Sequence, residues 1–235
     1  MALILRVDVD KPYGNSSLFK RILSKFSEDY ITFYNPCLGY LSHLEKLLQF
    51  CNENKINGYF YFRLCTFPSA KITELIQSGG HKAGLHTENT RSSESFENEL
   101  HAIRKRSDLS INTFTKHGSG ELKLGKYHYA PYEPEKYSEW AENSGCGFHF
   151  GNMIATSASD FDCKNNFYSH MFWIDREYRK VTLKSVEEVI QIAKTRHVPV
   201  LIHPCEFNSS ENAKNDLVKL VEYARQKNIS WITPF

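Results

Sequence analysis

Asp8 and Asp10 are the residues near the start of the sequence whose types and spacing point to chemistry. They follow an apolar run that begins at Ala2 and is typical of a buried strand. Side chains alternate across a strand with a period of two, so both carboxylates are expected on one side, with Cβ atoms roughly 6–7 Å apart. Like charges at this distance persist most easily around a metal ion or a shared proton. A polar strand end with Asx turns is the competing interpretation.

Histidines end three other predicted strands. His86, His117 and His203 each close an apolar or β-branched run. The carboxyl ends of parallel strands meet at one end of a barrel, where the active sites of such folds lie. We therefore expect these histidines beside the two aspartates. The competing interpretations are a strand cap for His203, which precedes Pro204, and an ordinary loop for His117, which begins a His-Gly-Ser-Gly stretch.

The elements that must position these residues alternate along the whole chain. Strand patterns cover residues 2–10, 59–64, 81–86, 111–116, 147–150, 171–174, 198–203 and 230–233. Helical spacing covers residues 18–28, 41–55, 69–76, 93–106, 133–143, 183–195 and 210–227. This alternation predicts an α/β fold with a parallel sheet and helical crossovers. With 235 residues and no linker or repeat, we expect one domain over residues 1–235.

Composition narrows the classes of partner. A formal net charge of +2 provides no basic field for nucleic acid or an anionic membrane. No run approaches the ~20 apolar residues that a membrane span needs, and charges interrupt the N-terminus too early for a signal peptide. The six scattered cysteines form no Cys-x-x-Cys pair, which favours reduced thiols and a cytoplasmic protein. The composition does not predict an oligomeric state.

Three motifs resemble those of the polysaccharide deacetylases of carbohydrate esterase family 4. Asp8-Val9-Asp10 resembles the family's opening Asp-Asp motif. Residues 80–87, Gly-His-Lys-Ala-Gly-Leu-His-Thr, resemble its Gly-His-Glu-Ile-Gly-x-His-Thr motif. Residues 201–204, Leu-Ile-His-Pro, resemble its late hydrophobic-x-His motif. The motifs occur in the family's order and span nearly the whole chain.

This resemblance implies a seven-stranded, incomplete (β/α) barrel that binds a divalent metal, most often zinc. The implied reaction is hydrolysis of an N-acetyl group on a sugar. By order in the motif, Asp8 would be the general base and Asp10 a metal ligand, although the inserted Val9 leaves the reverse assignment open. His86 would be a metal ligand and His203 the general acid. The backbone N–H of Tyr132 would stabilise the oxyanion.

The sequence departs from the family pattern at two positions. Thr90 stands where the family has its second metal histidine, and threonine is a poor zinc ligand. His117 is the first candidate to replace that ligand, and Glu88 is the second. The family's Arg-x-Pro-Tyr motif is here Tyr129-Ala-Pro-Tyr132, without the arginine that orients the base. Arg63 or Lys11 could compensate for it, or the chemistry could differ.

The remaining histidines are expected to have lesser roles. His81 lies five residues from His86 and is expected on the other face of the strand, as a structural residue. His128, His149 and His170 are expected in or beside loops that could line the cleft. Residues 151–180 carry the least periodic pattern, and we expect a lid or substrate loop there.

Three functions fit these observations. The first is a metal-dependent hydrolase that removes an N-acyl group from an amino sugar or sugar nucleotide, in polysaccharide biosynthesis. The second is a related C–N hydrolase that acts on a small non-sugar amide or cyclic imide. The third is a catalytically inactive sugar-binding relative, which the departures at Thr90 and Tyr129 favour. The retained acidic pair and histidines argue against the third.

Overall fold

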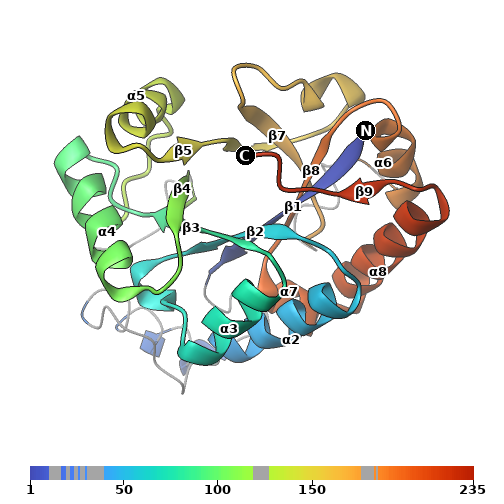
Figure 1. The fold of residues 1–235 in the computed structure, drawn as a ribbon. Helices are drawn as coiled ribbons and strands as arrows, with labels where there is room; N and C mark the ends of the chain where they lie inside the picture. Colours follow the sequence, from blue (N-terminus) through green and yellow to red (C-terminus); the bar gives the residue numbers. More distant parts are fainter. Residues whose placement is uncertain are drawn as a thin grey trace.

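The computed structural model describes residues 1–10, 17–19, 22–23, 26, 30, 40–118, 127–175, 183 and 185–235. Most of the helix predicted over residues 18–28 lies outside the described residues, as does Lys11. The rest forms an α/β fold in which helices surround a curved parallel sheet (Figure 1).

The sheet contains nine strands in the described part of the chain. Eight follow one another in the order β5-β4-β3-β2-β1-β8-β7-β6, and β9 pairs with the start of β1. All strand pairs are parallel. The strands are β1 (Ala2–Val9), β2 (Gly58–Phe62), β3 (Lys82–Thr87), β4 (Ile111–Lys116), β5 (Gly147–Phe148), β6 (Phe150–Ile154), β7 (Tyr168–Trp173), β8 (Val198–Ile202) and β9 (Ser230–Trp231).

Strand β1 is central because it pairs with β2 on one side and β8 on the other. Its eight residues are all buried, and they alternate between two packing environments. Leu3, Leu5, Val7 and Val9 belong to the large core shared with the helices, whereas Ile4 belongs to a second core inside the barrel. Arg6 and Asp8 follow Ile4 with the strand's period of two. The interior core consists of Ile4, Tyr59, Tyr61, Phe150, Tyr168, Met171 and Leu201.

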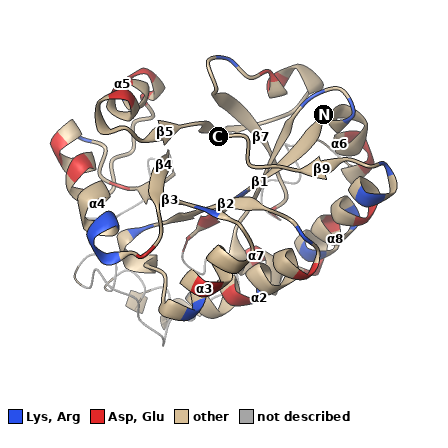
Figure 2. Ribbon diagram, viewed as in Figure 1, with Lys and Arg blue, Asp and Glu red and all other residues tan. Residues whose placement is uncertain are grey.

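The helices form an outer layer. They are α2 (Tyr40–Glu53), α3 (Ala70–Ser78), α4 (Ser93–Arg106), α5 (Pro134–Ser144), α6 (Val186–Ala193), α7 (Pro204–Ser209) and α8 (Glu211–Gln226). Serine side chains cap several N-termini, and Ser92 is the N-cap of α4. Residues of both charge signs lie along these outer helices (Figure 2). No described helix is long and apolar enough to cross a bilayer.

The barrel is incomplete between β4–β5 and β6. Strands β5 and β6 stand at the two ends of the strand order, so no ladder joins them. A side chain bridges this gap, because Asn152 Nδ2 on β6 donates to the backbone oxygen of Lys116 on β4 at 2.7 Å. We call this gap, with Asn152 and Lys116, the seam of the barrel.

The structure confirms the predicted fold class, an incomplete (β/α) barrel. The described sheet has nine strands, where the resemblance implied seven and the sequence pattern gave eight ranges. Strand β7 confirms the strand predicted over residues 171–174, whereas the pattern covered only the first residue of β6. Both strands belong to the sheet, so for their residues the expectation of a lid or substrate loop is wrong. A short 3₁₀ helix, Ala158–Phe161, separates these strands. The pattern missed most of β6 because this strand is short and partly exposed.

Candidate metal and catalytic site

Three side chains that could bind a metal meet at the carboxyl end of the barrel. Asp10 follows β1, His86 lies near the end of β3, and His117 directly follows β4. Their ligand atoms all lie within 4.8 Å of one another, and all three residues are buried. The structure therefore brings together the three residues expected as ligands, from strands that are not all neighbours in the sheet.

Asp10 is directed by a tight turn at the end of β1. Its backbone N–H donates to the oxygen of Asp8 at 2.9 Å, which closes a three-residue turn around Val9. Asp10 Oδ1 lies 3.5 Å from His86 Nε2 and 3.3 Å from His117 Nε2. The inserted valine thus leaves Asp8 and Asp10 facing the same histidine, because Asp8 Oδ2 is 3.6 Å from His86 Nε2.

The second ring nitrogen of each histidine faces a polar side chain. His86 Nδ1 lies 2.7 Å from the Thr115 hydroxyl on β4, which leaves Nε2 for the cluster. His117 Nδ1 lies 3.7 Å from Glu88 Oε1, and Glu88 in turn pairs with the buried Arg63. Partners of this kind are typical around metal-binding histidines. Glu88 therefore faces the side of the His117 ring that is turned away from Asp10.

The loop that carries Glu88 is fixed by helix α4. Glu99 on that helix accepts hydrogen bonds from the Thr87 hydroxyl at 2.6 Å, from the Glu88 N–H at 3.0 Å and from the Asn89 N–H at 3.1 Å. Burial and the nearby Glu88 raise the pKa of Glu99 to about 7. The end of β3 is thus anchored to the outer layer.

The group of Asp10, His86 and His117, which we call the Asp10 cluster, fits a small divalent cation. Ligand atoms about 2.0–2.1 Å from a tetrahedral zinc ion lie about 3.4 Å apart, close to both distances from Asp10 Oδ1. That oxygen is buried and has no hydrogen-bond partner among the described residues. Burial alone would raise the pKa of Asp10, but His117 and His86 hold it well below its usual range. Burial lowers the pKa of His86, which favours the neutral imidazole that binds metals.

Asp8 is held by a guanidinium that no sequence pattern singled out. Arg6 Nε donates to Asp8 Oδ1 at 2.8 Å, and Arg6 Nη2 donates to Asp8 Oδ2 at 2.6 Å. Both side chains are almost completely buried. A buried bidentate pair fixes the carboxylate and compensates its charge. Of the two residues that could have compensated for the missing arginine, Arg63 pairs with Glu88 instead, and Lys11 lies outside the described residues.

His203 stands on the other side of Asp10 and is held by Asp175. Its Nε2 lies 3.5 Å from Asp10 Oδ2, while its Nδ1 pairs closely with Asp175 Oδ2. Asp175 Oδ1 also accepts the His203 backbone N–H at 3.1 Å. Burial alone would lower the pKa of His203, but Asp175 and Asp10 outweigh it and raise the pKa well above its ordinary value. The imidazole is thus held as a proton donor.

The two departures from the family motif have different structural outcomes. Thr90 is buried and its hydroxyl lies 3.3 Å from the Tyr137 hydroxyl of α5, so it packs against the outer layer. Tyr129 lies under the cations of Arg91 and Lys136, at 5.9 and 5.5 Å.

Tyr132 lies beside the β6 strand. Its ring is 5.8 Å from that of Tyr137, and a Cβ on Gly151 would come within 2.9 Å of its hydroxyl oxygen. Burial raises the pKa of Tyr132 to about 12. The role expected for its backbone N–H stays a prediction.

The remaining histidines divide between the site and the framework. His81 packs edge-on against Phe60 at 4.7 Å and pairs with Asn52 at 2.7 Å, as expected of a structural residue. His128 lies beside the site, with its ring centroid 5.9 Å from that of His117. His149 instead stacks on Phe235 at 4.0 Å.

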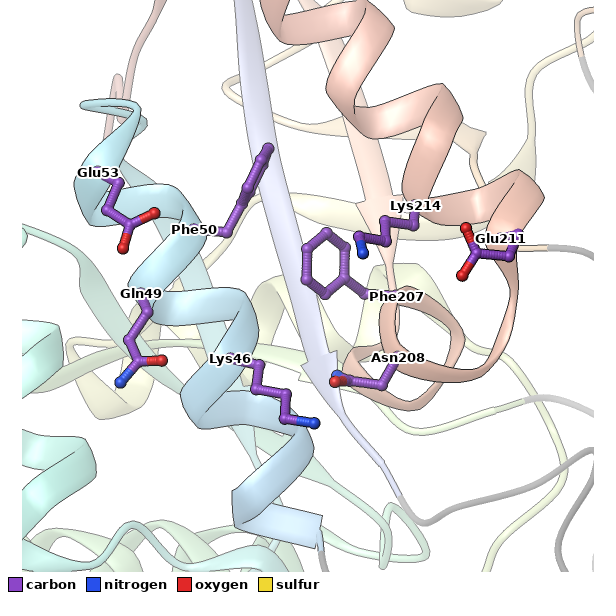
Figure 3. A pocket seen from close by; sticks show the side chains of 8 residues that line it. All are labelled: Lys46, Gln49, Phe50, Glu53, Phe207, Asn208, Glu211 and Lys214. Atoms are coloured by element: carbon purple, nitrogen blue, oxygen red, sulfur yellow. The ribbon is translucent and has the colours of Figure 1, made fainter.

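A pocket also lies outside the barrel, between α2 and the α7–α8 region (Figure 3). It has a volume of about 320 Å³, and the rings of Phe50 and Phe207 line it, tilted relative to each other with their centroids 5.2 Å apart. Lysines and glutamates of opposite charge surround the rings, and its lining contains no histidine, cysteine or aspartate. The reactive side chains described above lie elsewhere, at the mouth of the barrel.

Comparison with known proteins finds similar solved structures but no similar sequences. No protein-family model matches the chain, and no curated protein matches its sequence. The catalytic domain of a peptidoglycan N-acetylglucosamine deacetylase from Eubacterium rectale is similar, with a TM-score of 0.50 and 11% identity over 100% of this chain and 88% of that chain. A family 4 acetyl xylan esterase from Clostridium thermocellum, in complex with a cobalt ion, has a TM-score of 0.51 and 11% identity over 99% of this chain and 88% of that chain. An allantoinase has a TM-score of 0.53 and 9% identity over 99% of this chain and 87% of that chain.

Because the sequence identities are this low, the similarities show a shared fold and nothing more specific. The chain has the fold of the polysaccharide deacetylases along its whole length.

Proposed function

We propose that this protein is a metal-dependent hydrolase that removes an N-acyl group from an amino sugar or sugar nucleotide during polysaccharide biosynthesis. The acyl group we propose first is acetyl. The observation that carries the proposal is the convergence of Asp10, His86 and His117 between Asp8 and His203. A cation site flanked by a carboxylate and an imidazole contains the parts that amide hydrolysis requires.

Asp10, His86 and His117 would hold the metal. Two imidazoles and one carboxylate form a ligand set that suits zinc and leaves a position open. A divalent cation at such a site lowers the pKa of water and polarises a carbonyl group. Asp8 is the better candidate for the base, because Arg6 holds both of its oxygens while Asp10 Oδ1 faces the two imidazoles.

The remaining residues would transfer protons and stabilise charge during the reaction. Asp8 would accept the proton of the attacking water as the new C–O bond forms, using lone pairs that Arg6 leaves available. The backbone N–H of Tyr132 would donate to the oxyanion of the tetrahedral intermediate. His203 would give its proton to the nitrogen as the C–N bond breaks, so that the products are a carboxylate and an amine. Asp175 would keep the His203 ring oriented throughout.

Release of acetate from a panel of N-acetylated substrates tests this proposal. The panel contains chitooligosaccharides, N-acetylglucosamine and a uridine-diphosphate-linked N-acetyl sugar, incubated with zinc-loaded protein. We expect release from at least one of them, and a loss of ~10²–10⁴-fold in Asp8→Asn with zinc content unchanged. Asp108→Asn, which alters an exposed aspartate, is the matched control and keeps wild-type activity. Release that is independent of metal, or equal in Asp8→Asn, would refute the mechanism.

The second candidate is hydrolysis of a small non-sugar amide or a cyclic imide. The likeness in fold to an allantoinase supports including it. Allantoin and hydantoin therefore belong in the same assay. Activity on these compounds, without any on the N-acetyl sugars, would favour this candidate over the first.

A further inference from the structure

The guanidinium of Arg6 joins the base to the opposite side of the barrel. Besides the two bonds to Asp8, its Nη1 donates to the Gly151 oxygen at 2.7 Å and its Nη2 donates to Asn152 Oδ1 at 3.0 Å. Arg6 is completely buried and lies 5.7 Å from the ring centroid of Tyr61. The position of the Asp8 carboxylate thus depends on β6, a strand that does not pair with β1.

Asn152 makes a second connection with the other half of its amide. Its Nδ2 donates to the oxygen of Lys116 at 2.7 Å, and Lys116 directly precedes His117. No backbone ladder joins β4 to β6, so this amide spans the seam of the barrel. One side chain is therefore hydrogen-bonded both to the guanidinium that holds Asp8 and to the strand end that carries His117.

We propose that Asn152 is a positioning residue, which sets Asp8, through Arg6, relative to the strand end that carries His117. The proposal rests on the proposed function. An amide suits this place because it presents an acceptor and a donor on the same carbon of a single planar group. Aspartate would offer no donor to Lys116 and would compete with Asp8 for the guanidinium.

A purely structural role would be to close the seam. In that case Asn152→Ala would lower stability, and any loss of activity would be independent of Arg6. The positioning role predicts instead that the effects of Asn152 and Arg6 on turnover are coupled, because one acts through the other.

The test is a double-mutant cycle on 4-nitrophenyl acetate with the zinc-loaded full chain. The 4-nitrophenolate leaves without a proton, so this ester reports on the base and bypasses the role of His203. The variants are Asn152→Ala, Arg6→Lys and the double variant, since lysine keeps the buried charge but cannot bind Asp8 through two nitrogens. Met153→Ala, at a half-exposed position on the same strand, is the matched control.

We expect kcat to fall about tenfold in Asn152→Ala, with KM and zinc content within about twofold of wild type, because misplacing a supporting group typically costs 10–100-fold. The double variant should be no slower than Arg6→Lys, within about twofold. A kcat for Asn152→Ala equal to that of Met153→Ala would overturn the proposal. Losses that multiply in the double variant would also overturn it.

A spectroscopic measurement keeps this inference separate from the proposed function. A guanidinium hydrogen-bonded on all sides rotates slowly about its Cζ–Nε bond, so Arg6 should give separate Nη resonances in nitrogen NMR spectra, identified by their loss in Arg6→Lys. We expect them to merge in Asn152→Ala and to persist in Met153→Ala. If wild type is inactive on every acyl substrate, merged resonances would still support the Asn152–Arg6 link, whereas unchanged resonances would overturn it.

Discussion

Asp175 illustrates how single residues complete the site. It binds both the Nδ1 and the backbone N–H of His203, and it is almost completely buried. Asp175→Asn should therefore lower kcat for an N-acetyl substrate by at least tenfold, and by no more than the ~10²–10⁴-fold that a general acid contributes. Because Asp175 lies outside the Asp10 cluster, zinc content should stay at the wild-type level. Steady-state kinetics with elemental analysis test this, and an unchanged kcat would remove Asp175 from the account.

The sequence predicted the residues that end strands but missed their partners. The sequence predicted the site residues at strand ends because parallel strands bring their carboxyl ends together. These residues are Asp8, Asp10, His86, His117 and His203. Arg6 was missed because it lies inside the apolar run, where an arginine appears only as an interruption. Asp175 directly follows Ile174, just after a predicted strand, so the rule that identified the histidines could also have found it.

Strand β3 depends on a glycine inside the sheet. A Cβ at Gly84 would lie 2.4 Å from Tyr61 Cε1 and 2.8 Å from the Thr113 oxygen. Gly84→Ala should therefore lower the free energy of unfolding by about 1–3 kcal/mol, which is typical of overpacking. Urea denaturation measures the change. A variant as stable as wild type would show that Tyr61 can move aside without cost.

The residue before β3 gives the fold a dependence on pH. His81 is buried against Phe60, and burial lowers its pKa to about 4 from an ordinary value of 6.5. The neutral ring therefore contributes stability that is present above pH 6.5 and is lost as the pH falls towards 4. Between pH 7 and pH 5 the wild type should lose about 1–2 kcal/mol more unfolding free energy than His81→Gln. Parallel curves of unfolding free energy against pH for the two proteins would contradict the lowered pKa of His81.

Strands and helices with regular spacing were predictable, and the seam of the barrel was not. Helix α2 and strand β4 match the predicted ranges closely because an apolar face repeats over enough residues. β5 and β6 are short, and their pairing depends on contacts with distant parts of the chain. No local pattern specifies such contacts, so the closure through Asn152 became visible only in the structure.

At the scale of the whole molecule, stability and chemistry lie at opposite ends of the barrel. Phe235 packs against His149, Phe150 and Tyr168, and its backbone bonds to the Tyr59 hydroxyl. These contacts lie near the amino ends of the strands, where β9 pairs with Ala2 and Leu3. Phe235→Ala should therefore lower the melting temperature by several degrees and leave kcat within about twofold of wild type. A loss of kcat at unchanged stability would show that the two ends are coupled.

The central claim is that Asp10, His86 and His117 bind one metal ion, and metal content tests it most directly. Elemental mass spectrometry is performed on wild type, His86→Ala and His117→Ala after loading with zinc and removal of excess. Thr90→Val, whose hydroxyl lies against Tyr137, is the control, and Glu88→Gln tests the second candidate ligand. We expect about one equivalent of zinc in wild type, in Thr90→Val and in Glu88→Gln, and near none in the two histidine variants. Absence of zinc from wild type, or its retention in His117→Ala with loss in Glu88→Gln, would contradict the account.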